Sequence, residues 1–248
     1  MSDNFDKSYL AHLQELGHSK ALSTQIIDGF DIWYSDILPK DKNAQIIDFG
    51  CGVGDFLEYL KIKGYGNVEG VDINIRLCSQ ARQRTGYIIH HLKDIDIFVS
   101  SHKNSFDFVN IKDVLEHLSE DDAIRVLTQL KLILKPQGVL FVSCPQMCGF
   151  TSVFTLYNDY THKKIFTERS LKQLLRCSSF ENIKIVHPKQ KFKFELSSML
   201  LRVAQKIWFL IIKLLYFIER PGEDIPPYHG DRIALIAVNQ EHSSENTI

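Results

Sequence analysis

The sequence has no cysteine pattern that would support a disulfide framework or a zinc site. Its five cysteines are an odd number, and no two of them have the CxxC spacing. Buried thiols in a reducing compartment are therefore expected. No other ligand spacing demands a metal, so none is predicted.

The chain also lacks an excess of charge, a secretory leader and a long unbroken apolar run. It has 29 Lys and Arg against 30 Asp and Glu, which argues against a nucleic-acid partner bound through a broad basic surface. Residues 1–6 are polar and acidic, unlike a signal peptide. The apolar stretch 207–218 is short and contains Lys213, so a conventional membrane-spanning helix is not expected. A cytoplasmic location is predicted.

Strand and helix patterns alternate through most of the 248 residues, of which 44% are hydrophobic. This alternation favours a single α/β domain, 1–248, with a mostly parallel sheet and helices on both faces. Residues 1–43 form an N-terminal extension with a helix at 20–38. The predicted strands are residues 44–49, 68–71, 87–92, 106–111, 139–144, 182–186 and 232–238. The predicted helices that follow the first strand are 55–63, 73–84, 119–134, 168–178 and 195–219.

Three glycines follow the first predicted strand, in the order Gly50, Gly52 and Gly54, and a helix comes next. Glycines let the backbone turn sharply and approach a ligand closely, and a helix N-terminus offers free N–H groups. Dinucleotide-binding folds use GxGxxG instead, and here Asp48 precedes the turn. A carboxylate at that position suits a cofactor that carries an ammonium group.

Further carboxylates follow the next strands. Asp72 ends the second strand and could accept the hydroxyls of a ribose. Asp94, with Ile95, follows the third strand and could contact an adenine, and Asp113 follows the fourth. Each aspartate alone is more often a helix cap or turn residue. Their coincidence at the carboxyl ends of four strands favours a ligand site instead.

These segments together resemble class I S-adenosylmethionine-dependent methyltransferases. Residues 46–54 look like the first motif of that family, 68–72 like its acidic second motif, 106–118 like its fourth strand and 134–140 like the turn before the fifth. The resemblance covers the cofactor-binding core, 44–144. It implies a Rossmann-like seven-stranded sheet whose last strand runs antiparallel.

The resemblance also implies the cofactor, S-adenosylmethionine, and the residues that hold it. Asp48 and the glycines would surround the methionine part, Asp72 the ribose, and Asp94 with Ile95 the adenine. The full set of expected cofactor contacts is Asp48, Gly50, Cys51, Gly52, Gly54, Asp72, Ile73, Asp94, Ile95, Asp113 and Val114.

Residues 145–166 form a long irregular connection after the fifth strand, and this is the predicted acceptor loop. His162 is the first candidate for the general base, because an imidazole titrates near working pH. A histidine that only pins the loop is an equally good interpretation. Asp159 could orient His162 or bind the acceptor, and Tyr160 could stack on a ring. His117, in the loop after the fourth strand, is the second candidate for the base.

A narrower resemblance concerns the acceptor. The stretch Asp159-Tyr160-Thr161-His162, followed by residues 166–175 and 179–180, is similar to methyltransferases of bacterial surface polysaccharide and O-antigen synthesis. It implies a sugar hydroxyl or sugar phosphate as a small-molecule or glycan acceptor. Quinone-ring O-methyltransferases share the Asp113–His117 pattern and remain an alternative, as do protein and RNA acceptors. A non-enzymatic binding module on the same fold is a further alternative.

The helix predicted at 195–219 is apolar around most of its circumference. The charged residues Glu195, Arg202, Lys206 and Lys213 fall on one narrow stripe. The helix could bury its apolar surface in the core, against a second subunit, or at the inner face of the cytoplasmic membrane. A wider polar face would be typical of a membrane-surface helix. Burial against protein is therefore preferred here to peripheral membrane contact.

Overall fold

The computed structural model describes residues 21–147, 152–189, 196–222 and 231–240. It contains a seven-stranded sheet in the order β3-β2-β1-β4-β5-β7-β6. Neighbouring strands from β3 to β5 are parallel, whereas β7 runs antiparallel to both β5 and β6. The strands are β1 (Ile46–Phe49), β2 (Val68–Asp72), β3 (Ile88–His91), β4 (Phe106–Lys112), β5 (Leu134–Pro145), β6 (Asn182–Ile185) and β7 (Arg232–Val238). The predicted fold class is confirmed.

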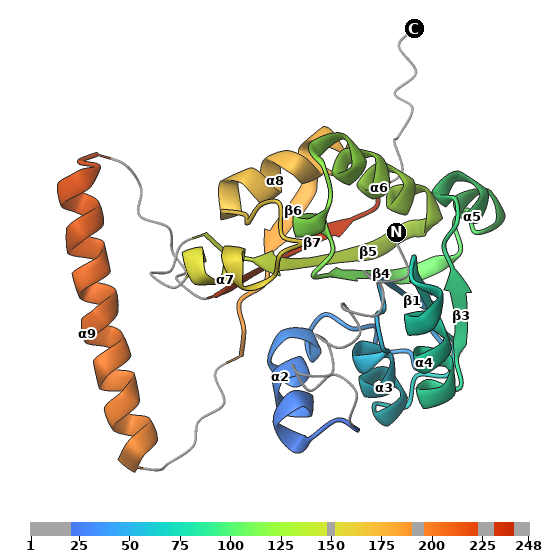
Figure 1. Ribbon diagram of the computed structural model, residues 1–248, viewed down its shortest axis with the longest axis horizontal. Coiled ribbons are helices and arrows are strands. Elements are labelled where there is room, and N and C mark those ends of the chain that lie inside the picture. The colour runs from blue at the N-terminus through green and yellow to red at the C-terminus, as the bar shows by residue number, and fades with distance from the viewer. Residues whose placement is uncertain (1–20, 148–151, 190–195, 223–230, 241–248) are drawn as a thin grey trace, which may run out of the picture.

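Helices cover both faces of the sheet (Figure 1). One layer contains α2 (Thr24–Tyr34), α3 (Asp55–Ile62) and α4 (Ile75–Thr85). The other contains α5 (Ile95–Ser101), α6 (Glu120–Ile133) and α8 (Glu168–Cys177). Each layer packs on its own hydrophobic core, and the two cores are separated by the sheet. Because helices cover both faces, the central strands are mostly apolar, and all four residues of β1 are buried, including Asp48.

Helix starts follow the sequence closely. Ser119 caps α6 by accepting from the backbone N–H of Asp122, and Thr167 caps α8 in a reciprocal arrangement with Ser170. Serine and threonine are preferred at this position because their hydroxyls accept the free N–H groups of the first turn.

Three segments differ from the prediction. Strand β5 begins at Leu134 and so includes residues 134–140, which resembled a turn, and its pairing with β4 shifts between Phe106 and Phe108. Helix α5 was not predicted. The connection at 145–166 is not wholly irregular, because it contains the short helix α7 (Ser152–Asn158).

The long helix α9 (Leu196–Glu219) forms as predicted but does not pack into the core. Figure 1 shows it standing apart from the sheet and the helices that cover it. Leu210 is 69% exposed and Phe217 is 62% exposed. The apolar surface of α9 is therefore not buried in the protein's own core, which was one of the expected arrangements. No helix among the described residues has the length and apolar character needed to cross a membrane.

Parts of several predictions lie outside the described residues. These are residues 1–20 of the N-terminal extension, 148–151 of the acceptor loop, Glu195 at the start of the long helix, and 241–248.

Candidate active site

The Gly-rich turn connects β1 to α3 through backbone that only glycine adopts easily. Gly50 has φ +81°, and a Cβ added there would lie 2.3 Å from Cγ2 of Val114. Gly52 has φ +53° and donates its N–H to Oδ2 of Asp72 at 2.9 Å. Gly54, with φ +87°, is the N-cap of α3. The glycines thus fix the turn and leave its inner surface bare.

Asp72 is the last residue of β2, and its carboxylate is hydrogen-bonded to the turn that follows β1. Besides the contact with Gly52, its Oδ1 accepts the backbone N–H of Asn74 at 2.8 Å. Burial raises the pKa of this carboxyl, and the backbone N–H groups that it accepts oppose the shift. Each carboxylate oxygen can accept a second hydrogen bond. The hydroxyls of a ribose could therefore bind here, as predicted from the sequence.

Asp48 lies beneath the turn at the end of a buried polar chain. The hydroxyl of Tyr34 donates to Oδ1 of Asn110 at 2.8 Å, and Nδ2 of Asn110 donates to Oδ1 of Asp48 at 2.6 Å. Burial raises the pKa of Asp48 to about 7. A buried carboxylate with this environment favours a cationic ligand group, because a nearby positive charge would stabilise its ionised form.

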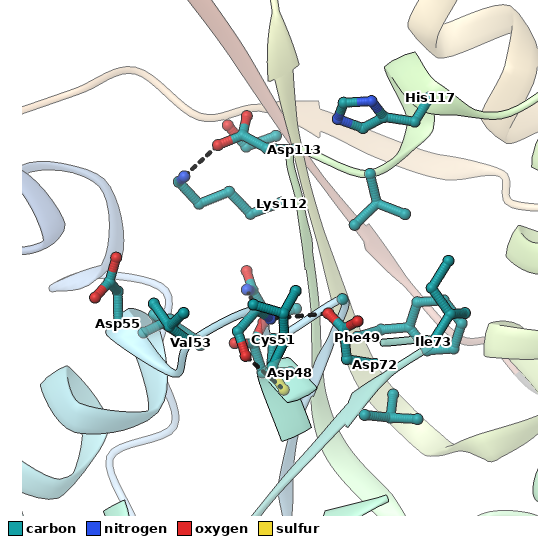
Figure 2. Close-up of a pocket in the computed structure, with 18 of the residues that line it drawn as sticks. Asp48, Phe49, Cys51, Val53, Asp55, Asp72, Ile73, Lys112, Asp113 and His117 are labelled. Carbon is teal, nitrogen blue, oxygen red and sulfur yellow. Dashed lines mark hydrogen bonds and ion pairs between the residues drawn. The ribbon is translucent and has the colours of Figure 1, made fainter. Parts of the chain in front are cut away.

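One cavity of about 1180 Å³ extends from the Gly-rich turn to the acceptor loop. Figure 2 shows Asp48, Cys51 and Asp72 on one side of it, and Lys112, Asp113 and His117 on the other. The volume exceeds that of an ordinary single-ligand pocket, so a cofactor and an acceptor could occupy it together. The predicted site residues that line it are Asp48, Gly50, Cys51, Gly52, Asp72, Ile73, Ile95, Asp113, Val114, His117 and Tyr160.

Four predicted site residues are not among the described residues that line the cavity: Gly54, Asp94, Asp159 and His162. Gly54 packs behind the turn, where an added Cβ would lie 3.2 Å from Cβ of Ala81. Asp94 is exposed and caps α5 by accepting the N–H groups of Asp96 and Ile97. Its contact with an adenine stays a prediction, while its neighbour Ile95 does line the cavity.

Asp113 sits between two cations that sequence analysis missed. It forms ion pairs with Lys112, its neighbour, and with Arg232 at the start of β7. Burial alone would raise the pKa of Asp113, but Lys112 and Arg232 outweigh burial and hold it well below its usual range. Asp113 adopts φ +55°, which turns the chain into the cavity. Arg232 is 119 residues away in sequence, so no local pattern could have paired it with Asp113.

On the acceptor side, His117 is linked to Asp159 through Thr161. Oγ1 of Thr161 lies 2.6 Å from Oδ1 of Asp159 and 2.8 Å from Nδ1 of His117. The hydroxyl has one proton, and the carboxylate is the stronger acceptor. Nδ1 of His117 then carries its own proton and donates to Thr161, which leaves Nε2 with a lone pair. Burial, and next the neighbouring His162, lower the pKa of His117, so its neutral form predominates at neutral pH.

His162 lies behind His117. Its Nδ1 is 3.0 Å from the carbonyl oxygen of Thr155, and the two imidazole rings are 4.9 Å apart. This position favours the interpretation of His162 as a residue that pins the loop. Thr161 had no distinguishing signal in the sequence beyond its place beside Tyr160.

Glu116 is fully buried beneath these histidines. Neither of its carboxylate oxygens has a hydrogen-bond partner among the described residues. Burial, and next the charge of Asp113, raise the pKa of Glu116 to about 8. The potential ligand atoms of Glu116, His117 and His162 all lie within 4.8 Å of one another, so these residues could hold a metal ion.

The sheet order, the Gly-rich turn and the carboxylates at the strand ends are those of the class I S-adenosylmethionine-dependent methyltransferase fold. Residues 30–185 match the family described as "Methyltransferase domain", and the chain belongs to that family.

Known relatives differ in their acceptors. The chain is 23% identical over 149 residues to phosphoethanolamine N-methyltransferase of Plasmodium falciparum, covering 58% of this chain and 56% of that protein. It is 32% identical over 107 residues to ubiquinone biosynthesis O-methyltransferase of Actinobacillus pleuropneumoniae, covering 40% of this chain and 44% of that protein. The chain thus spans about half the length of the curated relatives it matches.

Among solved structures, a SAM-dependent methyltransferase from Archaeoglobus fulgidus superposes with a TM-score of 0.65 at 21% identity, over 93% of this chain and 99% of that one. Phosphoethanolamine N-methyltransferase 2 of Haemonchus contortus, in complex with phosphomonomethylethanolamine and S-adenosylhomocysteine, gives 0.58 at 15% identity, over 95% of this chain and 58% of that one. At these identities the likeness shows the fold alone.

The cavity fits S-adenosylmethionine on the evidence of its own residues. Asp48 offers a buried carboxylate to an ammonium group, and Asp72 offers two oxygens to a ribose. Gly52 leaves open space for a ligand, because no atom lies within 4 Å of a Cβ added there.

Proposed function

We propose that this protein methylates a hydroxyl group, with His117 as the general base. The observation that carries the proposal is the hydrogen-bonded series Asp159–Thr161–His117, which leaves Nε2 of His117 unprotonated at the wall of the cavity. A general base needs a lone pair, which the tautomer of His117 places on Nε2. It must also reach the acceptor, and His117 lines the cavity.

Bound S-adenosylmethionine supplies the methyl group on an activated sulfonium. Nε2 of His117 accepts the proton of the acceptor hydroxyl as its oxygen becomes nucleophilic. The resulting imidazolium donates through Nδ1 to Thr161, whose hydroxyl remains hydrogen-bonded to Asp159. The negative charge of Asp159 stabilises the imidazolium through this connection. Lys163 donates its backbone N–H to the carbonyl of Glu116 at 2.8 Å, which holds the loop against His117.

We infer that the acceptor is a sugar hydroxyl or sugar phosphate of surface-glycan synthesis. The support is the resemblance of residues 159–180 to methyltransferases of that pathway, together with the lining of the cavity. Phe30 and Trp33 of α2 offer rings on which a sugar could stack, and Lys163 and Arg232 offer positive charge to a phosphate. Tyr160, 98% exposed, stands at the mouth, where it could close on the acceptor.

A phenolic acceptor such as a quinone precursor is the second candidate. The same aromatic residues would suit a flat ring, and a curated relative acts in ubiquinone biosynthesis. A screen with methyl-labelled S-adenosylmethionine against sugar phosphates, nucleotide sugars, dihydroxyphenols and phosphoethanolamine separates the classes. Methylation of the amine alone would contradict the proposal of a hydroxyl acceptor.

Matched histidine variants test the base. We expect His117→Ala to lower kcat by about 100- to 10 000-fold, as removal of a general base does. We expect His162→Ala to lower it by less than about tenfold, because His162 supports His117 from behind. The reverse order would assign the base to His162. Loss of turnover in a chelator, with recovery on adding a metal, would make His117 a ligand instead of the base.

We also propose that α9 docks on an anionic membrane surface. Three of the four charged residues of α9 are cationic, with Glu219 at its end the acidic one, and Trp208, 48% exposed, suits the interface. Apolar residues occupy most of the remaining surface, and they are exposed in the single chain.

Flotation with liposomes that contain anionic lipid tests the docking. We expect the wild type to float and Trp208→Ala/Leu210→Ala to remain in solution. Phe154→Ala, which removes a 70% exposed ring from α7, is the matched control and should float. If the wild type stays in solution and sediments as a dimer that the double variant abolishes, α9 is a subunit interface instead.

A further inference from the structure

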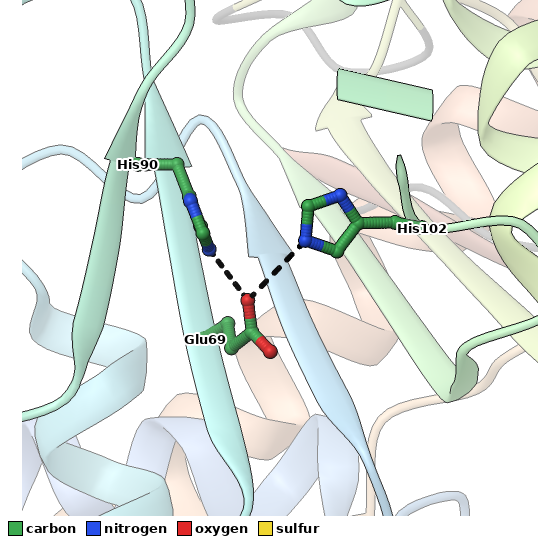
Figure 3. Close-up of side chains that lie close together, drawn as sticks. All are labelled: Glu69, His90 and His102. Atoms are coloured by element: carbon green, nitrogen blue, oxygen red, sulfur yellow. Dashed lines mark hydrogen bonds and ion pairs between the residues drawn. The ribbon is translucent and has the colours of Figure 1, made fainter. Parts of the chain in front are cut away.

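Outside the cavity, two histidines and a glutamate converge from three elements (Figure 3). Glu69 lies on β2, His90 on β3, and His102 is the residue that ends α5. Glu69 pairs with Ile88, so His90 is two residues further on and faces the same side of the sheet. None of the three lines the cavity described above.

The spacing of their ligand atoms suits a small cation. Nε2 of His90 lies 2.5 Å from Oε2 of Glu69, and Nε2 of His102 lies 3.9 Å from the same oxygen. All the potential ligand atoms lie within 4.8 Å of one another. In a tetrahedral zinc site with bonds of about 2.0–2.1 Å, ligand atoms are separated by roughly 3.4 Å. The 2.5 Å contact is a hydrogen bond between His90 and Glu69, so an ion would replace the shared proton and the two side chains would move apart, while His102 would move closer.

His102 is already oriented as a metal ligand would be. Its Nδ1 is 2.7 Å from the carbonyl oxygen of Phe98, which can only accept a hydrogen bond. Nδ1 therefore carries a proton, and Nε2, which faces Glu69, is the nitrogen that could bind a metal. The ring stacks on that of Phe98 at 4.2 Å between centroids. This backbone carbonyl is the kind of outer partner that fixes the tautomer of metal-bound histidines.

The separation between His102 and Glu69 has a second implication. At 3.9 Å, the contact is too long for a hydrogen bond. A cation between Nε2 of His102 and Oε2 of Glu69 would attract both atoms and draw them together. Two imidazoles and one carboxylate favour a zinc-class ion over calcium or magnesium, which prefer oxygen ligands.

The three side chains are half-buried, with exposed fractions of 22% for Glu69, 29% for His90 and 21% for His102. Solvent can therefore reach the position of a fourth ligand. We propose that Glu69, His90 and His102 bind one zinc-class divalent cation, with water completing the coordination. The ion would tie the end of α5 to β2 and β3, while the other end of α5 supplies Ile95 to the cofactor cavity.

Metal titration of the chelator-treated full-length protein tests the proposal. Because Glu116, His117 and His162 could also bind an ion, all variants carry His117→Ala, which disables that second cluster. We expect Zn²⁺, in competition with a chromophoric chelator at pH 7.5, to bind at one equivalent. Glu69→Gln and His102→Ala should each weaken binding at least tenfold. His91→Ala removes another histidine of β3 that lies outside the cluster, and it should leave binding unchanged.

Thermal unfolding provides the second readout, since His102→Ala also removes a stacked ring. Zn²⁺ should raise Tm in the His117→Ala background and in its His91→Ala derivative, but not in the Glu69→Gln derivative. Co²⁺ should give the visible absorption bands of a four-coordinate site in the same variants. Absence of binding, or binding that Glu69→Gln and His102→Ala leave unchanged, would overturn the proposal.

Discussion

The two halves of the cavity are built in different ways. The half that we assign to the cofactor consists mainly of backbone turns and carboxylates at the ends of β1 and β2, within residues 48–73, and Ile95 of α5 adds to it from outside that segment. The acceptor half draws on α2, the turn after β4, the loop at 159–163 and Arg232 of β7. A ligand that every member of a class shares can be held by one contiguous segment. A ligand that varies is held by side chains that distant segments bring together.

The largest loss of cofactor binding is expected from a substitution in the Gly-rich turn, because the shape of its backbone forms the cofactor half of the cavity. Gly50→Ala would place a Cβ 2.3 Å from Cγ2 of Val114 on backbone with φ +81°. Gly64→Ala is the matched control, because Gly64 has φ +82° but no atom within 4 Å of the added Cβ. The control should cost about 1–2 kcal/mol of unfolding free energy, the strain of a left-handed residue.

We expect Gly50→Ala to cost more than this control in denaturant unfolding and to weaken S-adenosylhomocysteine binding by at least about 100-fold. Similar behaviour of the two variants would mean that close packing against Val114 does not shape the site.

The second effect concerns charge in the cofactor half. Because the pKa of Asp48 is about 7, binding of an ammonium group must release a proton when the pH is lower. Affinity for S-adenosylhomocysteine should therefore fall by about tenfold for each pH unit below 7. Asp48→Asn should bind more weakly and lose this dependence, as calorimetry across pH 5.5–8 would show. An unchanged slope in Asp48→Asn would assign the proton to another group.

The same shift changes the stability of the protein without its cofactor. The folded pKa of Asp48 lies above its ordinary value of 3.8, so the folded state holds a proton that the unfolded state has lost. The free energy of unfolding should therefore decrease as the pH rises from about 4 to 7. Asp48→Asn should flatten that decline in urea titrations.

The smallest effect is expected in the acceptor half. Thr161→Val removes the hydroxyl between Asp159 and His117 and should lower kcat by about tenfold, the value of one such hydrogen bond. Binding of S-adenosylhomocysteine should not change. Thr161→Ser, which keeps the hydroxyl, is the control and should retain most of the activity. Equal losses in both variants would indicate that loop packing, not the hydroxyl, matters.

The same contrast explains what the sequence could reveal. The carboxyl ends of parallel strands meet at one edge, so Asp48, Asp72 and Asp113 could be placed together from local patterns alone. Arg232 could not, because its pairing with Asp113 depends on how β7 inserts beside β5. His117 was preferred over His162 only after the structure showed which ring lines the cavity.

The short helices α5 and α7 were not predicted from the sequence. Helix α5 follows Asp94, whose carboxylate was assigned to the cofactor although its spacing also suits a helix cap. The periodicity of Ile95, Phe98 and Val99 was a usable signal for this helix. In α9 the periodicity gave the element correctly but not its surroundings, since an apolar helix looks the same whether protein or lipid covers it.

Calorimetric titration of S-adenosylhomocysteine into the wild type, Asp72→Ala and His117→Ala tests the separation of the two halves most directly. We predict one binding site in the wild type and an affinity within about threefold of it in His117→Ala. Asp72→Ala, which loses charged hydrogen bonds to the ligand and the turn, should bind at least about 100-fold more weakly. Equal losses in the two variants, or wild-type affinity in Asp72→Ala, would contradict this account.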